Sequence, residues 1–280
     1  MSLQHSGYTY SLDRRLRQIG LGISLGLGLI ALIFPLLEAW HWLRDPLEFL
    51  DHPIHAAPSL TYWFGTDQQG HDVFARAIAG VRVAWQVVIA STLISLIIGA
   101  PLGVISGYRG GWLDRFLVFI MDGLYSLPGL LLSIAIAFVV GEGVWNAAIA
   151  LSVVYVPQYF RVIRNQTVSV KTELYIEAAR AMGANTWTII TRYLAQNVSQ
   201  SLPVLFSLNA ADGILTLAGL GFLGLGVPES VPEWGHDLKQ ALDALSTGEN
   251  IWWTAFFPGL ALSLMVTGLS LISESFNRDR

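Results

Sequence analysis

Apolar and polar residues alternate along this chain in long blocks, not at single positions. Six apolar blocks are each close to the ~20 residues that a helix needs to cross the hydrocarbon core of a bilayer, and they cover residues 19–40, 83–108, 116–140, 144–160, 198–227 and 251–276. Pro128 and Pro157 fall inside the third and fourth blocks, where they are expected to kink the helices. The pattern predicts an all-α, polytopic membrane protein with six transmembrane helices.

Polar stretches separate these blocks and define the predicted organisation. Residues 45–82 form a long polar segment after the first block, in which Pro46, Pro53 and Pro58 disfavour long helices. We therefore divide the chain into residues 1–82, an N-terminal anchor helix plus an outer-face segment, and residues 83–280, a transmembrane core. Within the core, residues 161–197 form a polar loop between the fourth and fifth blocks.

The composition agrees with a membrane protein. Of the 280 residues, 53% are hydrophobic and 13% are charged, whereas soluble domains carry about 25% charged residues. The net charge of −4 gives no sign of nucleic-acid binding, and a sequence without cysteine has no thiolate nucleophile and no thiolate metal ligand. There is also no Walker-type glycine loop with its lysine. We therefore expect no enzyme activity, no bound cofactor and no metal site in this chain.

The placement of basic residues orients the predicted helices. With a cytoplasmic N-terminus, 12 of the 16 lysine and arginine residues fall on the inner side and 4 on the outer side, as the positive-inside rule requires. Both termini and the loop at 161–197 are therefore expected on the cytoplasmic side. The first block lacks a small-residue cleavage site, so we interpret it as a retained anchor.

The stretch 172–197, TELYIEAARAMGANTWTIITRYLAQN, predicts two short helices separated by a glycine. Thr172 is placed to cap the first helix, Gly183 supplies a left-handed stop, and Asn185 is placed to cap the second. Leu174 and Met182 share one face of the first helix. Because a helix of roughly ten residues is too short to be stable in water by itself, this face is expected to dock on lipid or on another protein.

The same stretch carries a resemblance to a known family. Glu177-Ala178-Ala179, followed after three residues by Gly183, resembles the EAA loop of permease subunits in binding-protein-dependent ABC importers. Two further segments resemble the peptide and nickel branch of these importers. The first is GTDQQGHD at 65–72, followed by Arg76, and the second is FLGLGVP at 222–228, followed by a Trp-Gly pair at 234–235.

The resemblance implies a type I ABC permease fold in a bacterial inner membrane and a set of partners. These are a second homologous permease subunit, two cytoplasmic ATPase subunits that bind ATP and Mg, and an external solute-binding protein. It also implies that Glu177 faces a basic group on an ATPase, that Ala178 and Ala179 allow close backbone approach, and that Gly183 sets the turn.

Four positions depart from the family pattern. His71 stands where relatives tend to carry arginine, and Leu217 stands where they often carry an acid. Resembling loops usually end in a histidine and a Leu-Pro-Asn, whereas Tyr193 and Gln196 occupy the histidine and proline positions here. Without that proline, the second short helix is expected to run smoothly into the fifth block.

Two further groups of polar residues are candidate sites. Asp67, Asp72 and Arg76 are expected to cap and pair across a short helix on the outer face, as a brace or as a gate. Asn209 and Asp212 lie within the fifth block, where ionisable groups are functional candidates. Asp212 either lines a translocation path or forms a hydrogen bond to a neighbouring helix, and the sequence leaves both open.

Histidines 52, 55, 71 and 236 all fall in outer segments, where we expect them to be solvated and not to form a metal site. The predicted function is that of a permease subunit that carries peptides or a related small solute, nickel being one option. An ion-coupled secondary transporter or a channel subunit is the alternative. The sequence does not identify the solute or decide between homodimeric and heterodimeric permease pairing.

Overall fold

The computed structural model describes residues 4–40, 43–48, 53–245 and 250–278. The described residues form helices and no named strand; an isolated bridge joins Thr66 and Asp72. In chain order the elements are α1 (Gln4–Ala39), α2 (Val73–Arg109), α3 (Gly111–Tyr125), α4 (Gly129–Val140), α5 (Val144–Val170), α6 (Leu174–Ala181), α7 (Thr186–Thr188), the π-helix η1 (Ile189–Leu194), α8 (Ala195–Ser199), α9 (Leu202–Phe222), α10 (Trp234–Leu245) and α11 (Trp253–Arg278).

Among the described residues, four helices are long and apolar enough to cross a membrane, namely α1, α2, α9 and α11. The pair α3 and α4 would be a fifth span, although its two halves are bent by 91°. Helix α5 has 27 residues, but Asn146, Gln158 and Arg161 make it too polar to qualify on composition. The predicted number of six spans and the predicted side of the termini therefore stay predictions.

Several boundaries differ from the predicted ones. Helix α2 begins at Val73, ten residues before the predicted start, because Asp72 caps it there. The predicted third span, with a kink at Pro128, is instead two separate helices. Helix α5 continues to Val170, which shortens the predicted polar loop. Helix α10 was not predicted, because it is amphipathic and coincides with none of the six apolar blocks.

Helices α2 and α5 are held together by a glycine ladder, which we define as Gly99, Gly103 and Gly107 of α2. A Cβ atom at any of these positions would lie 2.7 Å from a carbonyl oxygen of α5. The oxygens belong to residues 156, 160 and 164, so the contact recurs every four residues along both helices. Small residues at this spacing let helix backbones approach closely in a membrane. The two helices thus form one tightly packed unit.

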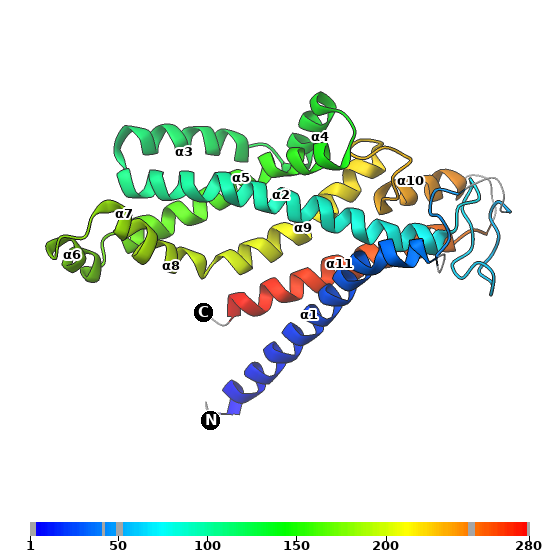
Figure 1. Ribbon diagram of the computed structural model, residues 1–280, viewed down its shortest axis with the longest axis horizontal. Coiled ribbons are helices and arrows are strands. Elements are labelled where there is room, and N and C mark those ends of the chain that lie inside the picture. Colours follow the sequence, from blue (N-terminus) through cyan, green and yellow to red (C-terminus); the bar gives the residue numbers. More distant parts are fainter. Residues whose placement is uncertain (1–3, 41–42, 49–52, 246–249, 279–280) are drawn as a thin grey trace.

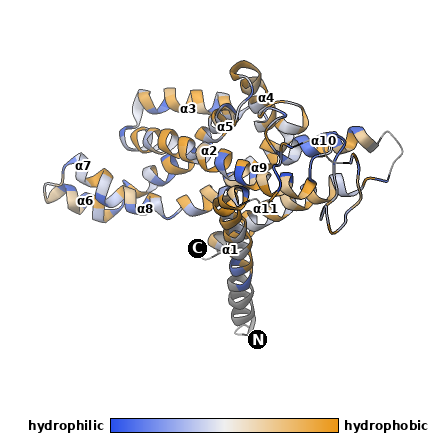
Figure 2. Cartoon of the chain, turned by 45° about the vertical axis from the view of Figure 1, so that its right-hand side comes forward, coloured by the Kyte–Doolittle hydropathy of each residue, from blue (hydrophilic) through white to orange (hydrophobic). Residues whose placement is uncertain are grey.

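The elements are arranged along one long axis (Figure 1). The short helices α6 and α7 lie at one end, and α10 lies at the opposite end beside the segment that precedes α2. Helix α1 crosses α11, where Gly20 lies against the backbone of Gly268. The long helices are largely hydrophobic, and hydrophilic residues are conspicuous on α10 (Figure 2). The predicted EAA loop, which contains α6 and α7, and the predicted outer-face segment, which precedes α2, therefore lie at opposite ends of the molecule.

Candidate functional sites at the two ends and in the middle of the molecule

The segment from Lys171 to Ser201, here called the α6–α8 segment, forms the first candidate site. Helix α6 is preceded by Glu173, whose side chain forms no capping hydrogen bond. The Thr172 hydroxyl instead donates to the carbonyl oxygen of Ser169 at 2.8 Å, so the predicted capping by Thr172 is wrong. Gly183 adopts a φ of 90°, the left-handed turn that was predicted.

The second short helix begins as predicted but is not a simple α-helix. The Asn185 side-chain oxygen accepts from the backbone N–H of Thr188 at 2.8 Å. Residues 189–194 then form π-helical turns, which are uncommon and concentrate at functional sites. The helical turns continue through α8 to Ser199 and so enter the fifth block as predicted, and Gln200 and Ser201 then separate α8 from α9 inside that block.

The two faces of α6 differ sharply in exposure. Leu174 and Met182 are 81% and 80% exposed, so the face predicted to dock lies on the outside of this chain. Ile176 and Ala179 are buried instead, and Ile176 packs with residues 189 and 194. Within the predicted EAA triplet, Glu177 and Ala178 are exposed. Ala179 is buried against its own chain, and the expectation that Ala178 and Ala179 allow close backbone approach stays a prediction.

A few polar contacts attach the α6–α8 segment to the long helices. The Lys171 ammonium donates to the carbonyl oxygen of Gly107 at 2.7 Å, at the end of the glycine ladder. The Arg180 guanidinium lies 5.7 Å from the ring centroid of Tyr108. Ser201 donates to the side chain of Gln166 at 2.7 Å. These contacts join the segment to both members of the α2–α5 pair and leave its outer surface open.

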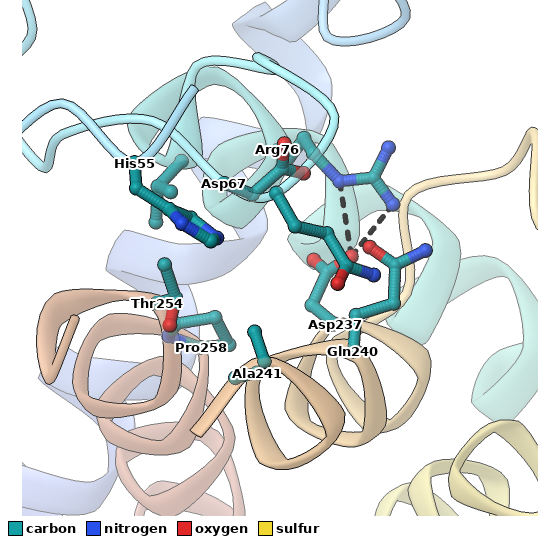
Figure 3. Close-up of a pocket in the computed structure, with 11 residues that line it drawn as sticks. His55, Asp67, Arg76, Asp237, Gln240, Ala241, Thr254 and Pro258 are labelled. Atoms are coloured by element: carbon teal, nitrogen blue, oxygen red, sulfur yellow. Dashed lines mark hydrogen bonds and ion pairs between the residues drawn. The ribbon is translucent and has the colours of Figure 1, made fainter. Parts of the chain in front are cut away.

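The second candidate site lies at the opposite end and is here called the polar brace: Asp67, His71, Asp72, Arg76, Glu233 and Asp237. At its centre the Arg76 guanidinium donates twice to one Asp237 oxygen, at 2.6 and 3.0 Å (Figure 3). Both side chains are buried. Asp72 caps α2 by accepting from the N–H groups of residues 74 and 75. The sequence predicted that Asp67, Asp72 and Arg76 pair with one another. This is wrong for Arg76, whose partner lies on α10.

His71 is also part of the brace and not solvated. Its Nδ1 atom lies 2.9 Å from an Asp67 oxygen, and the same carboxylate accepts the backbone N–H groups of residues 69 and 71. Burial alone would raise the pKa of Asp67, but the His71 ring and these N–H groups together lower it below its ordinary value. His236 is buried beside Gln240, so the predicted solvation fails there as well. His52 lies outside the described residues.

Glu233 is a residue of the brace that the sequence analysis missed. Its two oxygens accept from the N–H groups of Gly235 and His236 at 2.9 Å each, which caps the start of α10. Burial raises the pKa of Glu233 to about 7, although these N–H groups and Arg76 act in the opposite direction. A Cβ atom on Gly221 would lie on this carboxylate. The position after Pro232 carried no local signal of this role.

Trp234 and two glycines fix α10 against its neighbours. The indole N–H of Trp234 donates to the carbonyl oxygen of Ala77 at 3.0 Å, and a Cβ atom on Gly80 would lie 2.5 Å from that nitrogen. Gly235 approaches Ala218 so closely that a Cβ atom would meet its carbonyl oxygen at 1.9 Å. The Trp-Gly pair noted in the sequence thus joins α10 to both α2 and α9.

The brace offers little room for a ligand. A cavity beside Arg76 and Asp237, lined also by His55, Asp67 and Gln240 (Figure 3), has a volume of about 20 Å³, enough for one water molecule. Within the described residues, no group of three or more histidine, cysteine or acidic side chains could hold a metal ion. The geometry is that of a packed support.

The third candidate site lies midway along α9. Asn209 is buried, whereas Asp212 is exposed to a cavity of about 440 Å³ at the bend between α3 and α4. The Tyr155 hydroxyl donates to Asp212 at 2.9 Å. Of the two interpretations left open for Asp212, the hydrogen bond to a neighbouring helix is therefore observed, and the same side chain also lines a cavity. Leu217, in contrast, is fully buried in the apolar core.

Comparison with known proteins yields a family and several relatives. The family model of the binding-protein-dependent transport system inner membrane component matches residues 99–279. The glutathione transport system permease protein GsiD of Pectobacterium atrosepticum is 34% identical over 256 residues, which are 90% of this chain and 84% of the relative. The dipeptide transport system permease protein DppC of Alkalihalophilus pseudofirmus is 35% identical over 261 residues, which are 93% and 83% respectively.

A solved structure has a similar fold. One chain of the MetNI methionine ABC transporter, in inward-facing conformations, matches this chain with a TM-score of 0.57 at 23% identity. The match covers 74% of this chain and 94% of the other. At this identity the likeness concerns the arrangement of helices.

Proposed function

The chain belongs to the family of binding-protein-dependent transport system inner membrane components, and from this premise we propose that it forms, with a second homologous permease, the path by which a peptide or related small solute enters the cell. The family consists of permease subunits of ABC importers, which are not catalytic themselves. In this proposal the energy comes from ATP and Mg bound by two cytoplasmic ATPases.

The observation that carries the proposal is the exposed surface of the α6–α8 segment. Leu174, Met182 and Trp187 are between 73% and 81% exposed, although the segment leads directly from one long helix to another. An apolar patch on a polar segment marks an interaction site. We assign this surface to a cleft on the ATPase, with Glu177 facing a basic group there.

The energetics favour movement of the whole segment over a switch at one residue. Shifting a two-state equilibrium from 1:99 to 99:1 takes about 5.5 kcal/mol of differential binding, whereas truncating one partner of a buried charge pair costs ~2–5 kcal/mol. One contact at Glu177 is thus too weak by itself. Ile176 packs on Ile189 and Leu194 inside the segment, so the two short helices are built to move together, with Gly183 at the turn between them.

The polar brace has a supporting role in this proposal. Its buried pairs join α2 to α10 at the end opposite the α6–α8 segment, where an external binding protein would deliver the solute. A brace fits this place better than a gate, because Arg76 and Asp237 are buried and tightly bonded.

The names of the relatives support the proposed solute class. These proteins are described as glutathione and dipeptide permeases, and both solutes are peptides. Nickel, which the sequence resemblance admitted, is not among those names. The alternatives of an ion-coupled secondary transporter or a channel subunit receive no support from the comparisons.

Single-cysteine crosslinking tests the proposed docking, because the natural sequence contains no cysteine. Glu177→Cys is expected to crosslink to an ATPase subunit in vesicles that hold the assembled transporter. Leu60→Cys is the matched control, since Leu60 is 98% exposed but lies in the segment at the opposite end. Crosslinks from position 177 only to lipid, or equal ATPase crosslinking from position 60, would refute the proposal.

A further inference from the structure

The cavity at the bend between α3 and α4 has the size and lining of a small-ligand site. Its volume is about 440 Å³, within the range of ligand pockets. Helices α3, α4, α5 and α9 all contribute to it. Apolar and polar groups share the wall about equally, and the polar side chains are Tyr125, Tyr155, Gln158, Asn209 and Asp212.

The cavity holds one acidic side chain and no basic one. Asp212 is the eleventh of the 21 residues of α9, so it lies at the middle of a predicted span, where a carboxylate is costly without a partner. Its hydrogen-bond partner is the neutral Tyr155 hydroxyl. Among the described residues, no lysine or arginine forms an ion pair with it, and none lines the cavity.

Other acids near the cavity and at both ends do have cationic partners. Asp122 accepts from Arg161 at 2.8 Å, and the same guanidinium lies 4.1 Å from the ring centroid of Tyr125. Asp114 binds Arg164, and Asp237 binds Arg76. Arg161, the nearest cation on α5 in sequence to the cavity-lining Gln158, is therefore already neutralised, which leaves Asp212 as the net charge of the cavity.

A buried polar group, Asn209, lies beside Asp212 in the cavity lining. Asn209 is 1% exposed, and within the described part of the chain its side-chain nitrogen has no hydrogen-bond partner. Asn209 and Asp212 are three residues apart, so they lie on the same face of α9. The cavity thus exposes a carboxylate, and one helical turn away its lining holds a buried amide nitrogen without a hydrogen-bond partner.

These observations fit one chemical class of solute. An N-terminal ammonium group complements the carboxylate, and the adjacent carbonyl oxygen complements the amide donor. We propose that Asp212 and Asn209, with Tyr155 holding the carboxylate, form a transient site for the free amino end of a peptide on its way through the membrane. This assignment rests on the proposed function as an importer permease.

Transport by the complete transporter in proteoliposomes provides the first test. Uptake of alanyl-alanine and ATP hydrolysis are both measured at a saturating concentration of the peptide-loaded binding protein. Asp212→Asn is expected to lower uptake about tenfold while ATP hydrolysis continues, and Asp212→Glu is expected to retain most uptake. Glu142→Gln is the matched control, because Glu142 is an exposed acid that does not line the cavity. Wild-type uptake by Asp212→Asn would overturn the site alone, whereas no peptide uptake by the wild type would overturn the proposed function as well.

A second measurement tests whether the cavity attracts cations, without relying on uptake. Leu208 lines the same cavity, and Leu208→Cys would be the only thiol in the chain. Its reaction with a cationic methanethiosulfonate reagent is expected to exceed that with an anionic one by roughly tenfold, after correction with free cysteine. Adding Asp212→Asn should bring the ratio close to one. A ratio that is near one with Asp212 present would refute a cation-attracting cavity, whatever the uptake data show.

Discussion

The polar brace and the α6–α8 segment are both polar regions at the ends of long helices, yet they satisfy their side chains in opposite ways. In the brace, charged groups such as Arg76 and Asp237 are buried and bonded to partners far away in the sequence. In the α6–α8 segment, the contacts are mostly local, and large apolar side chains such as Met182 face outward. The charged groups of the brace find their ionic partners within this chain, although one buried oxygen of Asp237 accepts no hydrogen bond among the described residues, whereas the surface of the segment calls for another molecule to cover it.

This difference predicts where substitutions damage the fold. The largest effect is expected for Arg76→Met, which leaves Asp237 buried without its partner and should cost about 3–5 kcal/mol of unfolding free energy. Arg161→Met is the control, because the Arg161–Asp122 pair is about half exposed and exposed pairs contribute at most about 1 kcal/mol. Thermal unfolding of the detergent-solubilised protein measures both. Equal shifts in Tm would contradict the contrast.

The second effect concerns one glycine from each region. Gly235→Ala would press a methyl group onto Ala218, and we expect a loss of about 3 kcal/mol from overpacking. Gly183→Ala places its methyl group in open space, so only the left-handed backbone penalty of about 1 kcal/mol applies. The same unfolding assay compares them. A larger loss for Gly183→Ala would mean that the segment is packed as tightly as the brace.

The third effect is a pH dependence that belongs to the brace. The raised pKa of Glu233, about 7, means that the folded state binds a proton that the unfolded state releases near pH 4.5. The stabilisation is therefore fully present below pH 4.5 and is lost as the pH rises through 7, by about 2 kcal/mol between pH 5 and pH 7. The lowered pKa of Asp67 affects the free energy of unfolding only at more acidic pH.

Glu233→Gln tests this dependence, because glutamine imitates the protonated carboxyl group and does not titrate. The free energy of unfolding of the variant should fall less between pH 5 and pH 7 than that of the wild type. Identical slopes would show that Glu233 titrates at its ordinary value.

The smallest effect is expected for Asn185→Ala, which removes the cap of α7. Loss of such a cap costs about 1 kcal/mol, and it should act locally because the α6–α8 segment is held by few contacts. Hydrogen exchange of the Thr188 amide should accelerate about fivefold while Tm stays constant. An unchanged exchange rate would show that the capping bond does not contribute in solution.

The sequence was informative for most features that depend on neighbours in the chain, the failed cap at Thr172 being an exception. The apolar blocks, the turn at Gly183 and the cap at Asn185 are local signals, and the structure has all three. The family match and the likeness of fold confirm the predicted all-α importer permease. The partner of Arg76 could not be predicted in this way, because Asp237 lies 161 residues away.

Other misses have equally physical causes. Helix α10 is amphipathic, so a search for apolar blocks passes over it. Pro128 predicted a kink, but the 91° bend also requires the packing of α4 against α5, which no local pattern contains. The buried role of Ala179 depends on the fold of the segment on itself. The roles of Glu177, Asn209 and Asp212 in transport stay predictions.

The glycine ladder has a mechanical consequence for any movement of the permease. With its glycines facing carbonyl oxygens of α5 at every fourth residue, α2 fits α5 in a discrete set of registers. A slide of half a turn would bring the side chains of neighbouring residues such as Ala100 onto those oxygens. Displacement along the axis would therefore occur in steps of about 6 Å, four residues at about 1.5 Å each, and each step would forfeit one rung of three. Small excursions are thus forbidden between these two helices, and conformational change must be absorbed at joints such as the corner at Pro128.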